Sequence, residues 1–176
     1  NKAKPYLMDK IKGQEIISLI LGGPNKYYAF DKKELAKIFN EIKSNFLSKG
    51  YKVIVIPSLR TPKTIIDLAI EEFDVDSYVL NSVNKQAYLS AFALATNIVV
   101  TCDSTSMISE AASSGKPIFV AHMKSKRDNY RFKRFFKLFK EMGIIRDLGE
   151  KVESWTYTKF NEAERIAAII NNKIKN

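Results

Sequence analysis

The stretch that most constrains the fold runs from residue 97 to residue 121 and reads NIVVTCDSTSMISEAASSGKPIFVA. Two apolar runs rich in β-branched residues, at 97–101 and 118–121, enclose a polar turn and a short amphipathic segment. Such runs are typical of strands that are buried on both faces. The Ser and Thr residues after the first run favour a helix N-terminus, and Gly115 favours the helix end. The stretch therefore predicts a strand, a helix over about 106–114 and a second strand.

The amino end of that helix is a candidate anion site. Free N–H groups and the helix dipole favour negative charge there, and the polar residues 103–106 add side-chain donors. Glu110 follows about one turn later, where a carboxylate can accept both hydroxyls of a ribose. In the alternative interpretation, these residues only cap the helix, and Glu110 is a solvated surface residue. This stretch alone leaves both interpretations open.

The same alternation continues along the whole chain. Apolar runs at 15–23, 51–57, 77–80 and 144–148 predict further strands, and helical patterns follow Asp31 and cover 62–73, 85–95, 130–142 and 161–173. Strands that alternate with helices at this spacing predict an α/β fold, a Rossmann-like parallel sheet with helices on both faces. A chain of 176 residues fits one such domain, which we place at 15–176, with 1–14 as a linker or lead-in helix.

Three polar loops follow predicted strands and are expected at one edge of the sheet, where ligands of such folds bind. The loop at 22–26 begins with two glycines, so its backbone can approach a ligand closely. The loop at 58–62 brings a hydroxyl, a guanidinium and Thr61, which we expect to cap a helix that begins at Pro62. The third loop is 103–106. Each loop alone is ordinary turn chemistry, but together they favour binding of a nucleotide or a similar phosphate ester.

The motifs in these regions resemble those of the ELM1 family, which is named for a mitochondrial-fission factor. GGPNK at 22–26, SLRTP at 58–62, TCDSTSMISEA at 101–111 and GKP at 115–117 occur in the family's order, as does a pattern of Phe, Arg, Gly, Trp and Tyr residues over 131–167. The family is in turn similar to GT-B glycosyltransferases, which have two Rossmann-like halves. The resemblance implies that this chain is a GT-B C-terminal-type domain, the half that binds the nucleotide-sugar donor, of a longer two-domain protein.

The resemblance also implies roles for individual residues. Glu110 would hold the ribose hydroxyls, Arg60 would neutralise the phosphates, and the backbone at Gly22 and Gly23 would reach them. The candidate nucleotide- and phosphate-binding residues are Gly22, Gly23, Asn25, Lys26, Ser58, Arg60, Thr61, Asp103, Ser104, Thr105, Ser106, Met107, Ser109 and Glu110. The expected ligand is a nucleoside diphosphate sugar, with no cofactor and no metal. Because the acceptor site and the catalytic base of GT-B enzymes often lie in the other half, we expect the chain to need its own N-terminal domain for activity.

Two segments depart from the family pattern. Leu59 stands where the family has a second basic residue, and 84–88 (NKQAY) replaces an expected Asn-Pro-Tyr. A separate motif, Asp74-Val75-Asp76, matches the D-x-D that binds a metal in the other glycosyltransferase fold. Two solvated aspartates in a turn explain the D-x-D equally well, so we expect no metal there.

Four further residues are weighed as site candidates. His122 follows a predicted strand, so it lies at the ligand edge either as a sugar or base contact or as a polar rim residue. Arg127 and Arg131 precede or begin a basic helix and are possible contacts for the diphosphate. Cys102 is the chain's single cysteine, which excludes an internal disulfide and suits a reducing compartment. We expect it to be a buried small hydrophobe, with a pKa that the adjacent carboxylate raises.

Positive charge is concentrated in one segment. The chain has a formal net charge of +10, and 124–140 (KSKRDNYRFKRFFKLFK) carries most of it. Four Phe residues there follow helical spacing, so the helix either docks this stripe on the sheet or contacts an anionic membrane surface. We expect a cytoplasmic protein, peripheral to the inner membrane in the second case, and no nucleic-acid partner. A second hypothesis for the whole chain is a non-catalytic interaction module of a membrane-associated assembly that retains the GT-B fold.

Overall fold

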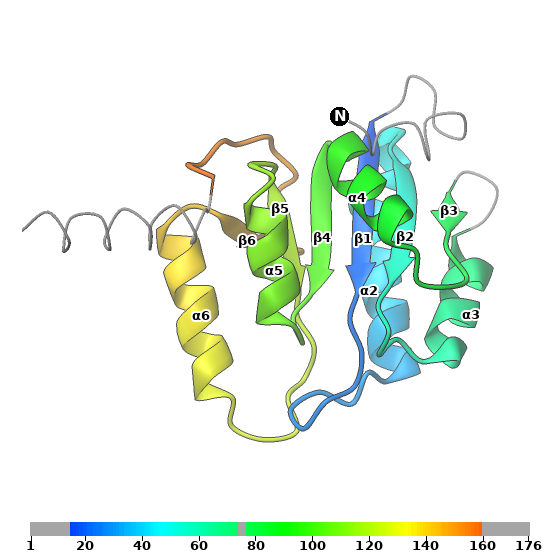
Figure 1. Ribbon diagram of the computed structural model, residues 1–176, viewed down its shortest axis with the longest axis horizontal. Coiled ribbons are helices and arrows are strands. Elements are labelled where there is room, and N and C mark those ends of the chain that lie inside the picture. Colours follow the sequence, from blue (N-terminus) through cyan, green and yellow to red (C-terminus); the bar gives the residue numbers. More distant parts are fainter. Residues whose placement is uncertain (1–14, 74–76, 160–176) are drawn as a thin grey trace, which may run out of the picture.

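The computed structural model describes residues 15–73 and 77–159, and within them it confirms the predicted α/β fold (Figure 1). The strands are β1 (Ile16–Leu21), β2 (Lys52–Pro57), β3 (Tyr78–Val79), β4 (Asn97–Thr101), β5 (Ile118–Ala121) and β6 (Ile145–Asp147). The helices are α2 (Lys32–Asn45), α3 (Lys63–Glu72), α4 (Lys85–Leu94), α5 (Thr105–Ala112) and α6 (Tyr130–Glu141), with a short 3-10 helix η1 (Leu47–Lys49). The predicted lead-in segment 1–14, the D-x-D at 74–76 and the terminal helix 161–173 lie outside the described residues.

The six strands form one parallel sheet in the order β3-β2-β1-β4-β5-β6. Helices α4 and α5 lie in front of the sheet in Figure 1, and α2 lies behind it. Both faces of the central strands are therefore covered, and every residue of β1 and β4 is buried. This double burial explains why these strands are apolar runs and not alternating sequences.

Small residues bring α4 close to the sheet. Its buried residues are Ala87, Ser90 and Ala91, and the Ser18 hydroxyl of β1 donates to the Ala91 carbonyl at 2.8 Å. A large side chain at either alanine would push the helix away from β1. The helix runs over β1 and β2, and only its amino end, with Lys85 and Tyr88, forms one wall of the site described below.

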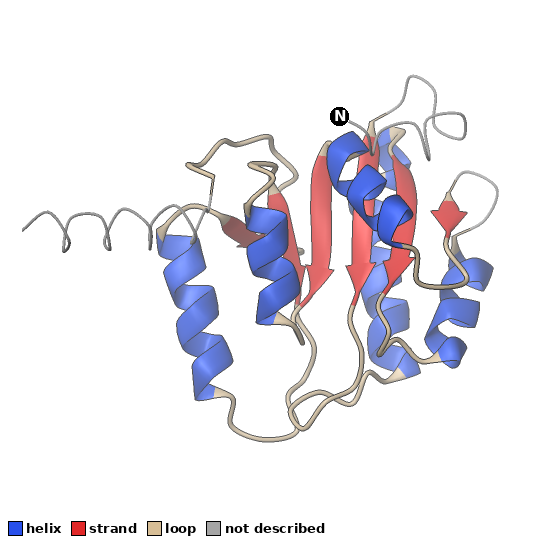
Figure 2. Cartoon of the chain, in the orientation of Figure 1, coloured by secondary structure: helices blue, strands red, loops and turns tan. Residues whose placement is uncertain are grey.

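The strand order reverses between β1 and β4. From β1 the chain builds outward through β2 and β3, and it then returns to the other side of β1 to build β4, β5 and β6. In open α/β sheets the crevice at such a reversal, beyond the carboxyl ends of the strands, is where ligands bind. Figure 2 shows the loops after β1 and β4 leaving the sheet at this edge, at the bottom of the view.

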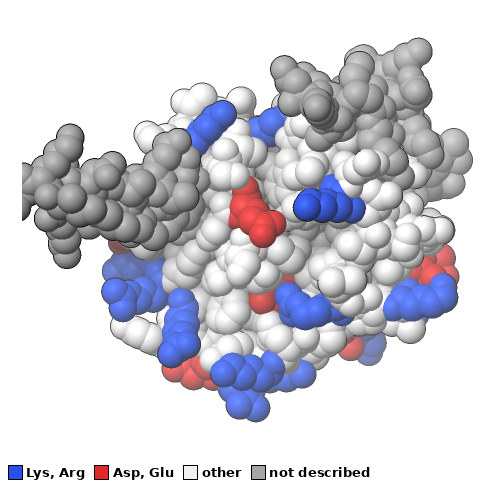
Figure 3. Space-filling view, in the orientation of Figure 1, with Lys and Arg blue, Asp and Glu red and all other residues white. Residues whose placement is uncertain are grey.

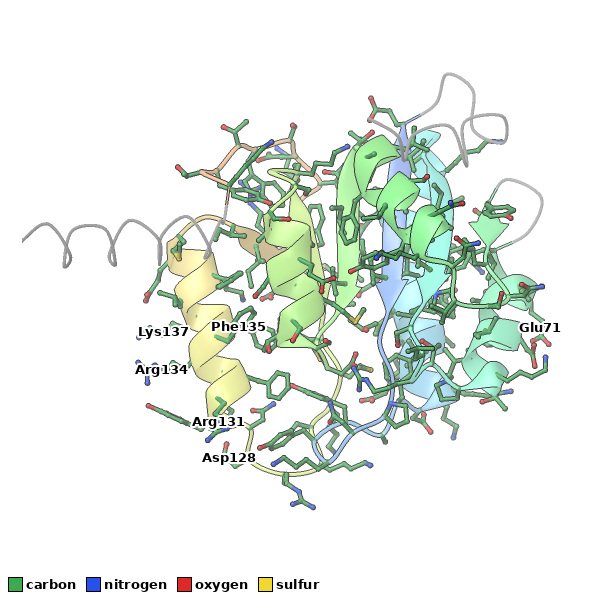
Figure 4. The ribbon with its side chains drawn as sticks, viewed as in Figure 1. Glu71, Asp128, Arg131, Arg134, Phe135 and Lys137 are labelled. Atoms are coloured by element: carbon green, nitrogen blue, oxygen red, sulfur yellow. The ribbon has the colours of Figure 1, made fainter. Side chains whose placement is uncertain are left out.

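Helix α6 docks its Phe stripe inward, as the first interpretation predicted. Phe136 and Phe139 are buried, and the Phe132 ring packs edge-on against Tyr28 with a centroid distance of 5.5 Å. Figure 4 shows Phe135 on the side of α6 that faces the rest of the molecule. The Phe stripe thus packs within the fold, with Phe132 and Phe135 half-buried.

The predicted cap of α3 is wrong. Pro62, and not Thr61, occupies the N-cap position, and no side chain caps the helix. The Thr61 hydroxyl is used elsewhere, because it donates to the Leu21 carbonyl at 3.0 Å and accepts from the Ser58 N–H at 2.8 Å. Thr61 therefore closes the loop after β2 onto the end of β1.

Candidate functional site

Asp103 ties together the three loops at the carboxyl edge of the sheet. Its side chain is fully buried and accepts hydrogen bonds from the Gly23 N–H at 2.9 Å, the Thr101 hydroxyl at 2.7 Å and Arg60 Nη2 at 3.0 Å. Gly23 and Arg60 lie in the loops after β1 and β2, Thr101 is the last residue of β4, and Asp103 itself lies in the loop after β4. The expected convergence of the three loops is therefore present, and Asp103 sits inside it instead of facing the open edge.

The two glycines are required by internal packing. A Cβ at Gly22 would lie 2.1 Å from Asp103 Oδ2, and a Cβ at Gly23 would lie 2.1 Å from the Arg60 carbonyl oxygen. No side chain fits at either position without moving the loops. The sequence predicted a close approach of this backbone to a ligand, which stays a prediction, and the structure shows that Asp103 and Arg60 also approach it closely.

Arg60 forms an ion pair inside the site. Its Nη1 donates to the Gly23 carbonyl at 3.0 Å and its Nη2 binds Asp103, while 42% of its side chain remains exposed. Asp103 compensates the guanidinium charge, so a bound phosphate would meet less positive potential here than Arg60 alone would supply.

Asn25 orders the neighbouring loop, because its Oδ1 accepts from the Tyr27 and Tyr28 N–H groups.

A hollow of about 290 Å³ opens beside these loops, between α4 and the amino half of α5. Its lining is mostly apolar and consists of Ile20, Ile56, Pro57, Ser58, Leu59, Val83, Asn84, Lys85, Tyr88, Met107 and Glu110. Sequence reasoning named Ser58, Met107 and Glu110 among these. It missed the apolar floor, which was assigned to the core strands, and it noted 84–88 only as a departure from a family motif.

Helix α5 points its amino end at the same edge. The Ser104 hydroxyl accepts from the Met107 N–H at 3.4 Å and caps the helix, and Ser106 is exposed. Thr105 and Ser109 are half-buried. The predicted strand–turn–helix is therefore confirmed, and its first turn lies next to the hollow that Met107 lines.

Glu110 and Tyr88 form the wall between two hollows. The Tyr88 hydroxyl donates to Glu110 Oε2 at 2.6 Å, and both residues also line a second hollow of about 460 Å³ between α4 and the carboxyl half of α5. Burial is the main cause that raises the pKa of Tyr88, and the hydrogen bond and charge of Glu110 raise it further. The phenol is therefore a hydrogen-bond donor at neutral pH.

The remaining candidates lie outside the hollow. Lys26 is exposed on the loop after β1, with its ammonium 4.9 Å from the Tyr27 ring centroid. His122 Nε2 lies 2.7 Å from Asp147 Oδ1 at the end of β6. Arg127 and Arg131 are exposed, and Figure 4 shows Arg131 at the amino end of α6. As ligand contacts, all of these residues stay predictions.

Cys102 is fully buried, as expected, and its Sγ accepts from the Met123 N–H at 3.2 Å. Burial is the main reason that its pKa rises to about 11, and the nearby Asp103 charge adds to the rise. The predicted direction is confirmed, with burial as its larger cause.

The described residues contain neither a metal-binding cluster nor a membrane-spanning helix. Among residues 15–73 and 77–159, no three His, Cys, Asp or Glu side chains gather into a set that would hold a metal ion. No helix in the same ranges is long and apolar enough to span a bilayer.

Comparison with known proteins identifies the family. The model of the mitochondrial fission ELM1 family matches residues 2–174. The chain belongs to the mitochondrial fission ELM1 family. Among the relatives of the chain, the uncharacterized protein RP120 of Rickettsia prowazekii is 31% identical over 175 residues, covering 92% of this chain and 48% of that protein. Mitochondrial fission protein ELM1 of Arabidopsis thaliana is 29% identical over 149 residues, covering 80% and 34%. The chain thus spans at most about half the length of these curated relatives.

Solved structures show the same fold for this ELM1 family chain. UDP-GlcNAc 2-epimerase of Neisseria meningitidis, solved with UDP-GlcNAc, superposes with a TM-score of 0.56 at 14% identity, over 99% of this chain and 49% of the enzyme. The MnaA–UDP structure from Staphylococcus aureus gives a TM-score of 0.53 at 14% identity, over 98% and 48%. The predicted α/β, Rossmann-like fold is therefore confirmed, and it resembles the fold of GT-B enzymes. That the chain is the C-terminal-type half stays a prediction.

Proposed function

We propose that this chain is the nucleoside-diphosphate-sugar-binding half of a GT-B-like glycosyltransferase. The observation that carries the proposal is the apolar hollow at the reversal of strand order, which has Glu110 on its rim and the amino end of α5 beside it. The hollow combines an apolar seat with a few polar groups, which is the usual composition of a nucleotide pocket.

Each part of the ligand has a matching group. A flat base fits the apolar floor of Ile20, Ile56 and Met107, and the ribose hydroxyls fit the Glu110 carboxylate. The diphosphate fits the amino end of α5, where free N–H groups and the helix dipole favour negative charge. Lys85, which lines the hollow and is exposed, supplies positive charge on the α4 side.

In the reaction that we propose, an acceptor hydroxyl oxygen forms a bond to the anomeric carbon of the sugar. The bond from that carbon to the β-phosphate oxygen breaks, and its electron pair leaves with the nucleoside diphosphate. The proton of the acceptor passes to a base, which we expect in the other half of the protein. The amino end of α5 and Lys85 would stabilise the charge that develops on the departing diphosphate.

The solved structures named above are consistent with this proposal, but the proposal is based on the hollow. The structural neighbours named above were solved with UDP and UDP-GlcNAc, and they match this chain over about half of their own length. The inference to this chain rests on the hollow, because identity of 14% is evidence of the fold alone.

The test is calorimetric titration of the intact protein with UDP, GDP, ADP and UDP-GlcNAc, alongside Glu110→Ala and a control, Glu141→Ala. We expect micromolar to millimolar binding of at least one of these ligands. Glu110→Ala should weaken it by about tenfold or more, a loss of about 1.4 kcal/mol. Glu141, which lies on α6 and pairs with Lys137, should be replaceable without effect. Failure of the intact protein to bind any of the four, or equal binding by the Glu110 variant, would overturn the proposal.

A second candidate function is membrane association of an interaction module, cytoplasmic and peripheral to the inner membrane. The outward face of α6 favours it. Tyr130, Leu138 and Met142 are 68%, 51% and 48% exposed there, and Arg134 and Lys137 point outward in Figure 4. Lys and Arg gather over α6 in Figure 3. A face that mixes basic and apolar side chains suits an anionic bilayer surface.

Vesicle co-sedimentation separates the two candidates. The intact protein should pellet with vesicles that contain phosphatidylglycerol but not with pure phosphatidylcholine, and Arg134→Glu with Lys137→Glu should abolish pelleting. Lys63→Glu, a reversal of an exposed charge on α3 and away from α6, should leave pelleting intact. Vesicle binding without nucleotide binding would favour the interaction module, and the absence of vesicle binding would contradict it.

A further inference from the structure

The Tyr88–Glu110 pair joins two helices that sequence reasoning treated separately. Tyr88 lies on α4 and Glu110 on α5, and the Tyr88 hydroxyl donates to Glu110 Oε2 at 2.6 Å. Both residues line the 290 Å³ hollow and the 460 Å³ hollow. The pair therefore stands where the two hollows meet, above the apolar floor.

Tyr88 is itself held in place. Its ring packs edge-on against Phe92, one turn later on α4, with a centroid distance of 4.6 Å and an interplanar angle of 85°. A tyrosine whose ring is fixed in this way presents its hydroxyl in one direction. That direction is toward Glu110.

Glu110 gains orientation from this contact. An exposed glutamate on a helix samples several side-chain conformations, and ordering it on binding costs conformational entropy. The hydrogen bond from Tyr88 restricts Glu110 before any ligand arrives. It uses one acceptor position of Oε2 and leaves the other positions of the carboxylate, which has about four in all, for two hydroxyl donors.

We propose that Tyr88 is a positioning residue that holds the Glu110 carboxylate for the two vicinal hydroxyls of a ribose, and that it thereby makes the site prefer ribonucleotides over 2′-deoxyribonucleotides. The inference rests on the proposed function and names the sugar that the site selects. A 2′-deoxyribose satisfies only one of the two oriented acceptor positions. Since Glu110 is exposed, water compensates part of that loss, and the preference is about tenfold, well below that of a fully buried site.

The test compares UDP with 2′-deoxy-UDP, and GDP with 2′-deoxy-GDP, by calorimetry on the intact protein. Wild type should bind the ribonucleotide of the preferred base about tenfold more tightly than its deoxy form. Tyr88→Phe keeps the ring and its contact with Phe92. It should weaken the ribonucleotide by about three- to tenfold and the deoxynucleotide by less than twofold, so that the preference falls to about twofold. The control Tyr157→Phe removes a hydroxyl that donates to the Lys116 carbonyl at 2.8 Å and should leave the preference unchanged.

A double-mutant cycle makes the result independent of any general loosening of α4. If Tyr88 acts through Glu110, then Tyr88→Phe in a Glu110→Gln background should cost less than about twofold further, because coupled residues are not additive. Equal weakening of ribo and deoxy ligands by Tyr88→Phe, or full additivity in the cycle, would overturn the inference while leaving nucleotide binding intact. Nucleotide binding by wild type without a ribose preference would do the same. Failure of wild type to bind any of the four diphosphates would overturn the proposed function itself and this inference with it.

Discussion

Gly22 lies where two loops of the site pack against each other, so a substitution there tests whether the loops are packed as tightly as the structure shows. Gly22→Ala would place a Cβ 2.1 Å from Asp103 Oδ2, and the buried network must shift to accept it. We expect the free energy of unfolding to fall by about 2 kcal/mol, within the range for overpacking. The measurement is urea denaturation.

Gly149→Ala is the matched control, because the nearest atom to its Cβ would be Glu41 Oε1 at 3.6 Å. Its free energy of unfolding should stay within about 0.5 kcal/mol of wild type. Equal stability of the Gly22 and Gly149 variants would show that the loops are looser than the structure has them.

For single residues, the sequence predicted which residues lie at the site better than it predicted which residues they contact. The glycine pair indicated a close approach, and Asp103 was named as a site residue, but a sequence does not show which atoms meet across 80 residues. The role of Arg60 toward a phosphate stays a prediction, and the sequence did not reveal the ion pair that Arg60 forms with Asp103. Nothing in the sequence indicated that Tyr88 belongs to the site, except that it lies in the segment 84–88, which differs from the family motif. A tyrosine on an amphipathic helix is ordinarily a packing residue.

At the scale of elements, α6 has one face that packs against the rest of the protein and one that is exposed. Phe139 is 2% exposed and Leu138, its neighbour in sequence, is 51% exposed. Phe139→Ala should lower the free energy of unfolding by about 3 kcal/mol or more, as is usual for a buried Phe, while Leu138→Ala should change it by less than about 0.5 kcal/mol. Thermal or urea unfolding of both variants checks this, and a mild effect at Phe139 would mean that the stripe does not pack on the sheet.

The junction of α6 with β6 should respond to acid. Partial burial of Asp147 opposes its ionisation, but the hydrogen bond from Lys140 and the charge of His122 outweigh it, so the net pKa lies below the ordinary value of 3.8. A lowered folded-state pKa contributes stability that is present above about pH 4 and is lost as pH falls through the folded-state pKa. Asp147→Asn should therefore show a shallower loss of stability below about pH 4 than wild type. A stability profile of Asp147→Asn that matches wild type below about pH 4 would contradict this assignment.

Element boundaries followed local chemistry where that chemistry was unambiguous. Asp31 caps α2 and Ser104 caps α5, because each has a suitable side chain directly before a helical pattern. The expectation for Thr61 was wrong, since its hydroxyl lies against the Leu21 and Gly22 carbonyls, about 40 residues away, which no local pattern reveals.

At the scale of the whole molecule, the alternation of apolar runs and amphipathic helices predicted the parallel sheet, and right-handed crossovers restrict how such a chain can wind. The order β3-β2-β1-β4-β5-β6 followed only once the structure showed which strands pair. The hollow is a property of that order, because its floor comes from β1 and β2 and its walls from α4 and α5. No single stretch of sequence contains it.

The central claim is that a nucleoside diphosphate occupies this hollow, and hydrogen–deuterium exchange of the intact protein with and without a saturating nucleoside diphosphate tests it most directly. We predict slower exchange in two segments, the amino half of α4 and the amino end of α5, with no change in α6. Protection confined to α6, or protection that is absent from both α4 and α5 under saturating ligand, would contradict the account.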